Sequence, residues 1–174
     1  MSTKYRVIIH KASLIVALVL PRLDYCNSML YGLPAYLLRR LQSVLNAAAR
    51  LIFRIRRSEY ISPALISLHW LRVPECISFK LALLTYRSIR GTAPRYLQSC
   101  FSHHLAVSHV RLSTVGKRAF SVSGATVWND LPPRVTSAPS LVIFRQRLKL
   151  FLFSQCYADT VSYTHLTLPT IYSV

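Results

Sequence analysis

The first group of side chains that could take part in chemistry lies in residues 22–34, RLDYCNSMLYGLP. This run contains an acid, a thiol, two phenols and an amide. Metal-dependent phosphoryl transfer needs two or three carboxylates that converge on Mg²⁺ ions. The chain has 5 acidic residues, and they fall in separate segments, at Asp24, Glu59, Glu75, Asp130 and Asp159. Asp24 has no second carboxylate near it in sequence. We therefore expect no nuclease or polymerase activity from this chain, and no catalytic residue.

A second reactive group, Cys100, His103, His104 and His109, is the one cluster that resembles a set of metal ligands. Zinc sites are usually built from two close ligand pairs, and no second cysteine is present here. Cys26 lies in an apolar run, where a thiol usually packs in the core. With 4 glycines and no glycine-rich phosphate loop, the sequence predicts no metal site and no cofactor.

The charge of the chain is one-sided. It has 22 Lys+Arg against 5 Asp+Glu, a net charge of +17 over 174 residues, and Arg outnumbers Lys. A field of this sign favours polyanions, nucleic acid first and anionic membranes second, and Arg suits phosphate geometry. The alternative is a piece of a larger protein that carries the matching acids, and the two interpretations are compatible. RNA or DNA is therefore the expected partner, with no small-molecule substrate.

An apolar run at residues 12–20, ASLIVALVL, follows three basic residues and resembles part of a signal peptide. It is shorter than the ~20 residues of a membrane span, and Pro21 and Arg22 close it. We expect a buried helix here. A small membrane-associated or secreted protein is kept as the alternative function. The 4 cysteines are widely spread, which favours reduced thiols over a disulfide framework.

Helical patterns fill most of the first hundred residues, so we expect a mainly α, bundle-like fold. Proline, glycine and apolar spacing predict helices at 11–29 (broken at Pro21 and stopped by Gly32 and Pro34), 35–57, 62–70 (capped by Ser62), 74–90 (ended by Gly91) and 94–101. A small irregular or β-hairpin segment is expected near 110–130, with Trp128 as an anchor. A C-terminal helix is expected over 140–153.

The predicted helix at 35–57 has the strongest periodicity. Its apolar seam is Leu37, Leu41, Val44, Ala48, Leu51 and Ile55. The opposite side is predicted to carry Arg39, Arg50, Arg54 and Arg57, flanked by Arg40, with Arg56 pointing elsewhere. No acid interrupts this stripe, which makes it a better phosphate candidate than a mixed face. A second basic group, Arg145, Arg147 and Lys149, lies on the closing helix.

Several runs together resemble one family, in the family's own order: RLDYCNSMLYGLP, LLRRLQSVLNAAARLIF, LISLHWLRVPECISFKLALLTYRSIRGTAPRYLQSCF, RLSTVGKRAF and GATVWNDLPPRVTSAPSLVIFRQRLKLFLF. The chain resembles the C-terminal, post-polymerase part of the reverse transcriptase polyprotein of vertebrate non-LTR (LINE-type, jockey-like) retrotransposons. The resemblance covers residues 11–157. It implies a helical region that grips template RNA and target DNA. The endonuclease and polymerase acids of the family would lie before Met1, and none maps onto this chain.

The resemblance suggests a division of the chain. Residues 1–10 are expected to be a leader outside the family, 11–101 a thumb-like or connector region, and 102–157 a C-terminal segment. The linker between these last two parts is shorter than is usual in the family, which predicts some mispacking. Residues 158–174 are expected to be a tail, in which VSYTHLTLPT (161–170) resembles a translated sequencing adapter. A gene remnant without function is a further alternative.

Overall fold

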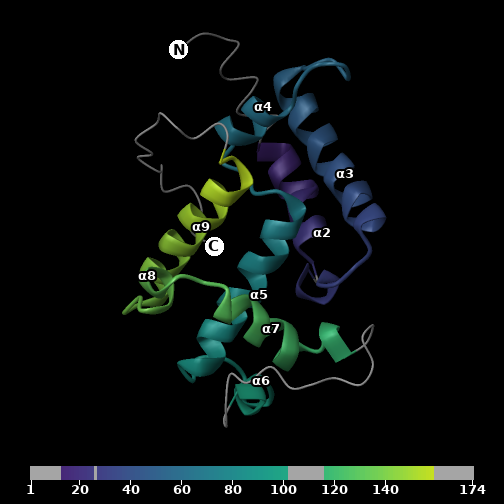
Figure 1. The fold of residues 1–174 in the computed structure, drawn as a ribbon. Helices are drawn as coiled ribbons and strands as arrows, with labels where there is room; N and C mark the ends of the chain where they lie inside the picture. Colours follow the sequence, from purple (N-terminus) through teal and green to yellow (C-terminus); the bar gives the residue numbers. More distant parts are fainter. Residues whose placement is uncertain (1–12, 26, 102–115, 159–174) are drawn as a thin grey trace.

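The computed structural model describes residues 13–25, 27–101 and 116–158. The expected mainly α fold is confirmed, because the elements of these residues are helices (Figure 1). After a helical run at 13–18, the elements are α2 (Leu20–Asp24), η1 (Asn27–Leu30), α3 (Ala35–Phe53), α4 (Ser62–Ser67), α5 (Val73–Ile89), α6 (Arg95–Gln98), η2 (Ser99–Phe101), η3 (Gly116–Arg118), α7 (Phe120–Asn129), α8 (Pro133–Thr136) and α9 (Leu141–Cys156).

Helix α5 is the centre of the core. It packs against η1, α3, α7 and α9, and Figure 1 shows it between α3 and α9. Leu81 and Ala82 are buried on it, and the ring of Tyr86 stacks on that of Phe144 from α9, with 4.3 Å between centroids. The Tyr86 hydroxyl donates to the carbonyl of Ala138 at 3.1 Å. The expected segments 11–101 and 102–157 therefore contribute to one hydrophobic core.

The N-terminal helix is interrupted at Val19, two residues before the break that the sequence predicts at Pro21. Residues 13–18 are helical, Val19 is a turn, and α2 follows with Pro21 in its first turn. The expected helical end at Met29 is wrong, because α2 ends at Asp24 and Tyr25 is extended. Asp24, the last residue of α2, pairs with a lysine. Its carboxylate lies 2.6 Å from the ammonium of Lys80 on α5, so this pair fastens α2 to the central helix.

Three helices end in the same way, with a left-handed residue after the last turn. These residues are Arg54 (φ 55), His69 (φ 54) and Gly91 (φ 70). In each case the next N–H reaches back five residues: Ile55 to Arg50 (3.1 Å), Trp70 to Leu65 (3.0 Å) and Thr92 to Arg87 (2.9 Å). This is the Schellman arrangement, in which glycine is the usual left-handed residue. The prediction at Gly91 is confirmed.

The same arrangement corrects two helix bounds. The helix predicted at 35–57 ends at Phe53, because Arg54 turns the backbone out of the helix. The helix predicted at 62–70 ends at Ser67, because His69 does the same. Ser62 is not its cap: it is the first helical residue, Ile61 occupies the capping position, and no side-chain cap bond is made.

The part of 110–130 that the structure describes contains no strand, and most of it is helical rather than irregular. Phe120–Asn129 is the helix α7, because packing on α5 outweighs the local β and turn propensities of its Ser, Val and Gly residues. A Cβ at Gly124 would lie 2.7 Å from Thr85 Oγ1, so glycine lets the two helices approach closely. The closing helix is confirmed as α9: Ser140 Oγ accepts from the Ile143 N–H at 3.3 Å.

Candidate nucleic-acid interface

The predicted apolar seam of α3 is only partly correct. The residues of α3 that are buried are Leu45, Ala48, Ala49 and Ile52. Val44 and Leu51, both placed in the seam by the sequence pattern, are 47% and 66% exposed. The buried face is thus rotated by about one residue, or ~100°, over this stretch. Because Ala48 and Ala49 have small side chains, this face of α3 packs closely against the core. The bulkier side chains of Val44 and Leu51 point outward.

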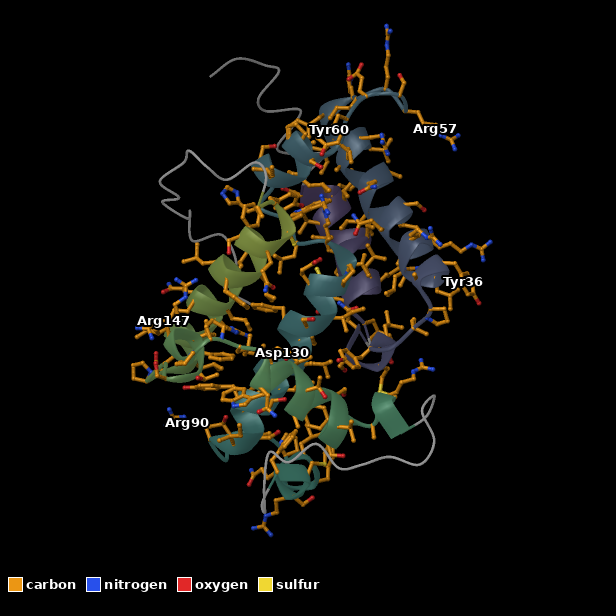
Figure 2. All side chains as sticks on the ribbon, viewed as in Figure 1. Tyr36, Arg57, Tyr60, Arg90, Asp130 and Arg147 are labelled. Carbon is orange, nitrogen blue, oxygen red and sulfur yellow. The ribbon has the colours of Figure 1, made fainter. Side chains whose placement is uncertain are left out.

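The predicted arginine stripe divides into two groups. Arg39 and Arg40 are exposed near the start of α3, whereas Arg54 and Arg57 are exposed after its last residue. Fifteen helical steps from residue 39 to residue 54 make the distance along the axis about 22 Å. Figure 2 shows Arg57 at the far end of α3 from Tyr36, pointing away from the molecule. Arg56, predicted to point elsewhere, is exposed beside it.

Arg50 does not belong to this outer surface. It is half-buried, and its Nε is buried with no hydrogen-bond partner in the part of the chain that the structure describes. Its carbonyl accepts the N–H that closes the end of α3. We therefore remove Arg50 from the candidate phosphate contacts. Its Nε cannot meet a phosphate without rearrangement of its surroundings.

The exposed arginines of this region form no ion pair within the described residues. Within residues 13–25, 27–101 and 116–158 the one ion pair joins Lys80 and Asp24. Neither the guanidinium groups of Arg39 and Arg40 nor those of Arg54 and Arg57 donate a hydrogen bond to the described residues. Glu59, exposed in the turn after α3, is the nearest acid in sequence. The positive field here is open to an external anion.

Two exposed tyrosines accompany these arginines, and the sequence reasoning missed them. Tyr36 is 58% exposed and Tyr60 is 75% exposed. Tyr36 precedes Arg39 and Arg40 by three and four residues, so the three lie together on one turn of the helix surface. The usable signal was aromatic residues interleaved with basic ones. We call Tyr36, Arg39, Arg40, Val44, Leu51 and the capping Arg54 the outer face of α3.

The basic residues of α9 do not gather into a similar face. Arg145 and Arg147 are exposed, but two helical steps set them about 200° apart around the axis. The Arg147 guanidinium donates to the carbonyl of Arg134 at 2.8 Å. Burial lowers the pKa of Lys149. In Figure 2 Arg147 lies on the opposite side of the molecule from Tyr36, so the two predicted basic groups are not one surface.

Cys76 and Glu75 of α5 form a cluster with Cys156 of α9. Burial raises the pKa of the Cys76 thiol to about 12, with smaller contributions from Asp24, Cys156 and Glu75. Burial likewise raises the pKa of Cys156 to about 12. The thiolate is the reactive form of cysteine, and these thiols stay protonated near neutral pH. The cluster therefore has a packing role, and no nucleophile is found in it.

The remaining candidates give no reactive site. In the described part of the chain, no three His, Cys, Asp or Glu side chains come together as metal ligands. Cys100 is exposed, while His103, His104 and His109 lie outside the described residues. None of the described helices is both long and apolar enough to cross a membrane. Comparison of the chain with protein-family models, with curated proteins and with solved structures finds no match.

Proposed function

We propose that the chain corresponds to the post-polymerase region of a non-LTR retrotransposon reverse transcriptase polyprotein, and that it binds RNA or DNA with little sequence preference. The resemblance of residues 11–157 supports the first part. The second part is carried by one observation: exposed arginines at both ends of α3 have no partner among the described residues. Phosphates can meet such groups without first displacing an internal carboxylate.

A binding role suits the placement of the acids better than a catalytic one. Asp24 is engaged by Lys80, and Glu75 has a buried carboxylate oxygen with no hydrogen-bond partner among the described residues. Glu59 and Asp130 are exposed on different segments. Two-metal phosphoryl transfer needs acids that converge on ions about 4 Å apart. Affinity in this proposal comes from the release of counterions when arginines neutralise phosphates.

The test is filter binding of mixed-sequence RNA and DNA oligonucleotides at rising salt. Each lost phosphate contact on a single strand reduces the slope of log affinity against log salt by about 0.7. The triple variant Arg39→Gln, Arg40→Gln and Arg54→Gln should therefore reduce that slope by about 2. Its matched control removes the same charge from exposed arginines elsewhere, through Arg22→Gln, Arg95→Gln and Arg134→Gln.

The control triple should bind almost as tightly as the parent chain. Salt-insensitive binding, or no binding at low salt, contradicts the proposed function. An equal loss in both triples would mean that net charge alone attracts nucleic acid, and the interface would then not lie on α3.

A membrane-associated or secreted protein remains the second candidate, favoured by one observation. Leu14 and Leu18, on the helical run at 13–18, are 64% and 60% exposed. Isolated apolar residues at a surface are ordinary, but two on one helix side favour an interfacial contact. Flotation of the chain with anionic vesicles, compared with the Leu14→Ser and Leu18→Ser double variant, tests this. Recovery of the parent chain in the vesicle-free fraction rejects the membrane association.

A further inference from the structure

The outer face of α3 is apolar in its middle and basic at its ends. Between Arg40 and Arg54 the exposed large side chains are Val44 and Leu51. The positive groups at the two ends are about 22 Å apart along the helix. A ligand that fits this face must therefore offer negative charge at separated points and apolar or aromatic surface between them.

A duplex does not offer that combination. Double-stranded DNA presents one negative charge per about 1.7 Å of its axis, and its base faces are stacked inside. Such a rod laid along α3 would meet arginines at the two ends and hold phosphates against Val44 and Leu51 in the middle. Those phosphates would lose water without gaining a partner, and the exposed tyrosines would have no base to contact.

A single strand does offer it, because its bases turn away from the phosphates and stack on aromatic side chains. Tyr36 is 58% exposed and lies one helical turn before Arg39 and Arg40. A base stacked on its ring would place its own phosphate within reach of both guanidiniums. Tyr60, 75% exposed, follows Arg57 by three residues in the turn after α3, so a ring and a cation are also close in sequence at the other end of the helix.

We propose that the outer face of α3 binds single-stranded nucleic acid, with bases stacked on Tyr36 and Tyr60 and lying against Val44 and Leu51 between them. Arg39 and Arg40 hold phosphates at one end, and Arg54 with Arg57 holds them at the other. This inference rests on the proposed function and adds strand selectivity to it. Uridine and thymidine strands share this chemistry, so both enter the test.

The experiment measures fluorescence anisotropy of four labelled probes with the full chain. They are an oligouridine, an oligothymidine, the matching duplex and an abasic strand of the same length and charge. Both base-bearing strands should bind more tightly than the duplex and the abasic strand. Tyr36→Ala should weaken single-strand binding by about 5- to 150-fold, the range that one stacked base provides.

Three controls separate stacking from other effects. Tyr36→Phe keeps the ring and should keep the affinity, whereas Tyr36→Ala should leave abasic-strand binding unchanged. Tyr96→Ala removes a tyrosine of similar exposure, 71%, that lies beside Arg95 on α6, and should have no effect. Circular dichroism of each variant shows whether it is folded.

The two proposals fail in different ways. Equal affinity for base-bearing and abasic strands, or tighter binding of the duplex, overturns the single-strand inference while nucleic-acid binding stands. Absence of binding to any of the four probes overturns both proposals. A third outcome is that anionic vesicles bind the chain through Tyr36 and Leu51 while the single strands do not bind there. This face would then contact a membrane surface, and the single-strand inference would be overturned.

Discussion

At the residue scale, Arg54 occupies a position at which most residues are costly. Its φ of 55 is left-handed, and this conformation costs a non-glycine residue roughly 1–2 kcal/mol. Gly91 occupies the equivalent position after α5 with φ 70. The chain thus has glycine at one of these helix ends and a strained arginine at another.

Arg54→Gly is therefore expected to stabilise the fold and weaken nucleic-acid binding. Relief of the left-handed strain should raise the free energy of unfolding by about 1 kcal/mol. Urea unfolding measures the first effect, and oligonucleotide anisotropy measures the second. The matched control is Gly91→Ala. Its new Cβ would have no other atom within 4 Å, so the substitution should lower the free energy of unfolding by about 1 kcal/mol through backbone strain alone. A lower free energy of unfolding in Arg54→Gly than in the parent chain would contradict the claim that Arg54 is strained.

At the element scale, the fold depends on how closely α5 and α7 approach. Thr85 and Ser123 are fully buried, and Ala125 is 1% exposed. Gly124 lies where a Cβ would be 2.7 Å from Thr85 Oγ1 and 2.9 Å from the ring of Phe101. These contacts join the segments on either side of residues 102–115. The stacking of Tyr86 on Phe144 is a second contact between these segments.

Gly124→Ala should overpack this interface. The new methyl group has Thr85 on one side and a ring on the other, so one helix must shift, at a cost of about 1–3 kcal/mol. Chemical denaturation of the variant beside the parent chain measures this cost. Addition of Thr85→Ala to Gly124→Ala removes the nearer contact and should recover part of the stability. Parent-like stability of Gly124→Ala would show that the helices lie farther apart than described.

At the scale of the whole molecule, the buried thiols link global stability to pH. In the folded chain, burial raises the pKa of Cys76 and of Cys156 from the ordinary thiol value of 9.0 to about 12. Burial raises the pKa of Tyr157 in the same direction. A raised folded pKa contributes stability that is complete below the unfolded pKa and is lost as pH rises through the folded one. Burial lowers the pKa of Lys149, so the contribution of this residue to the free energy of unfolding rises with pH instead.

We therefore expect the free energy of unfolding to fall as pH rises from 9 towards 12. Between these values the thiols ionise in the unfolded chain and keep their protons in the folded one. Urea unfolding at stepped pH measures the slope. Cys76→Ala should make that slope shallower, even if its stability is lower throughout. Cys100→Ala, which changes an exposed thiol, should leave the slope unchanged. Equal slopes in all three chains would contradict the buried-thiol account.

The sequence alone determined the helical class, most helix starts and the break before α2. These are local properties: proline fixes its own φ and lacks an N–H, glycine accepts a positive φ, and a serine hydroxyl caps its own helix. That is why Gly91 and Ser140 were placed correctly. The excess of basic charge over acids was also a property of the sequence, and it pointed to polyanionic partners before any geometry was known.

Only the tertiary structure decided which side of α3 faces the core. Leu51 and Ile52 are equally apolar neighbours, yet one is 66% and the other 1% exposed, because the surface of the partner helices selects between them. The same packing made α7 a helix, buried the Nε of Arg50 and paired Asp24 with Lys80 across 56 positions. Periodicity can rank possible faces of a helix, but the choice among them is made by distant residues that pack against it.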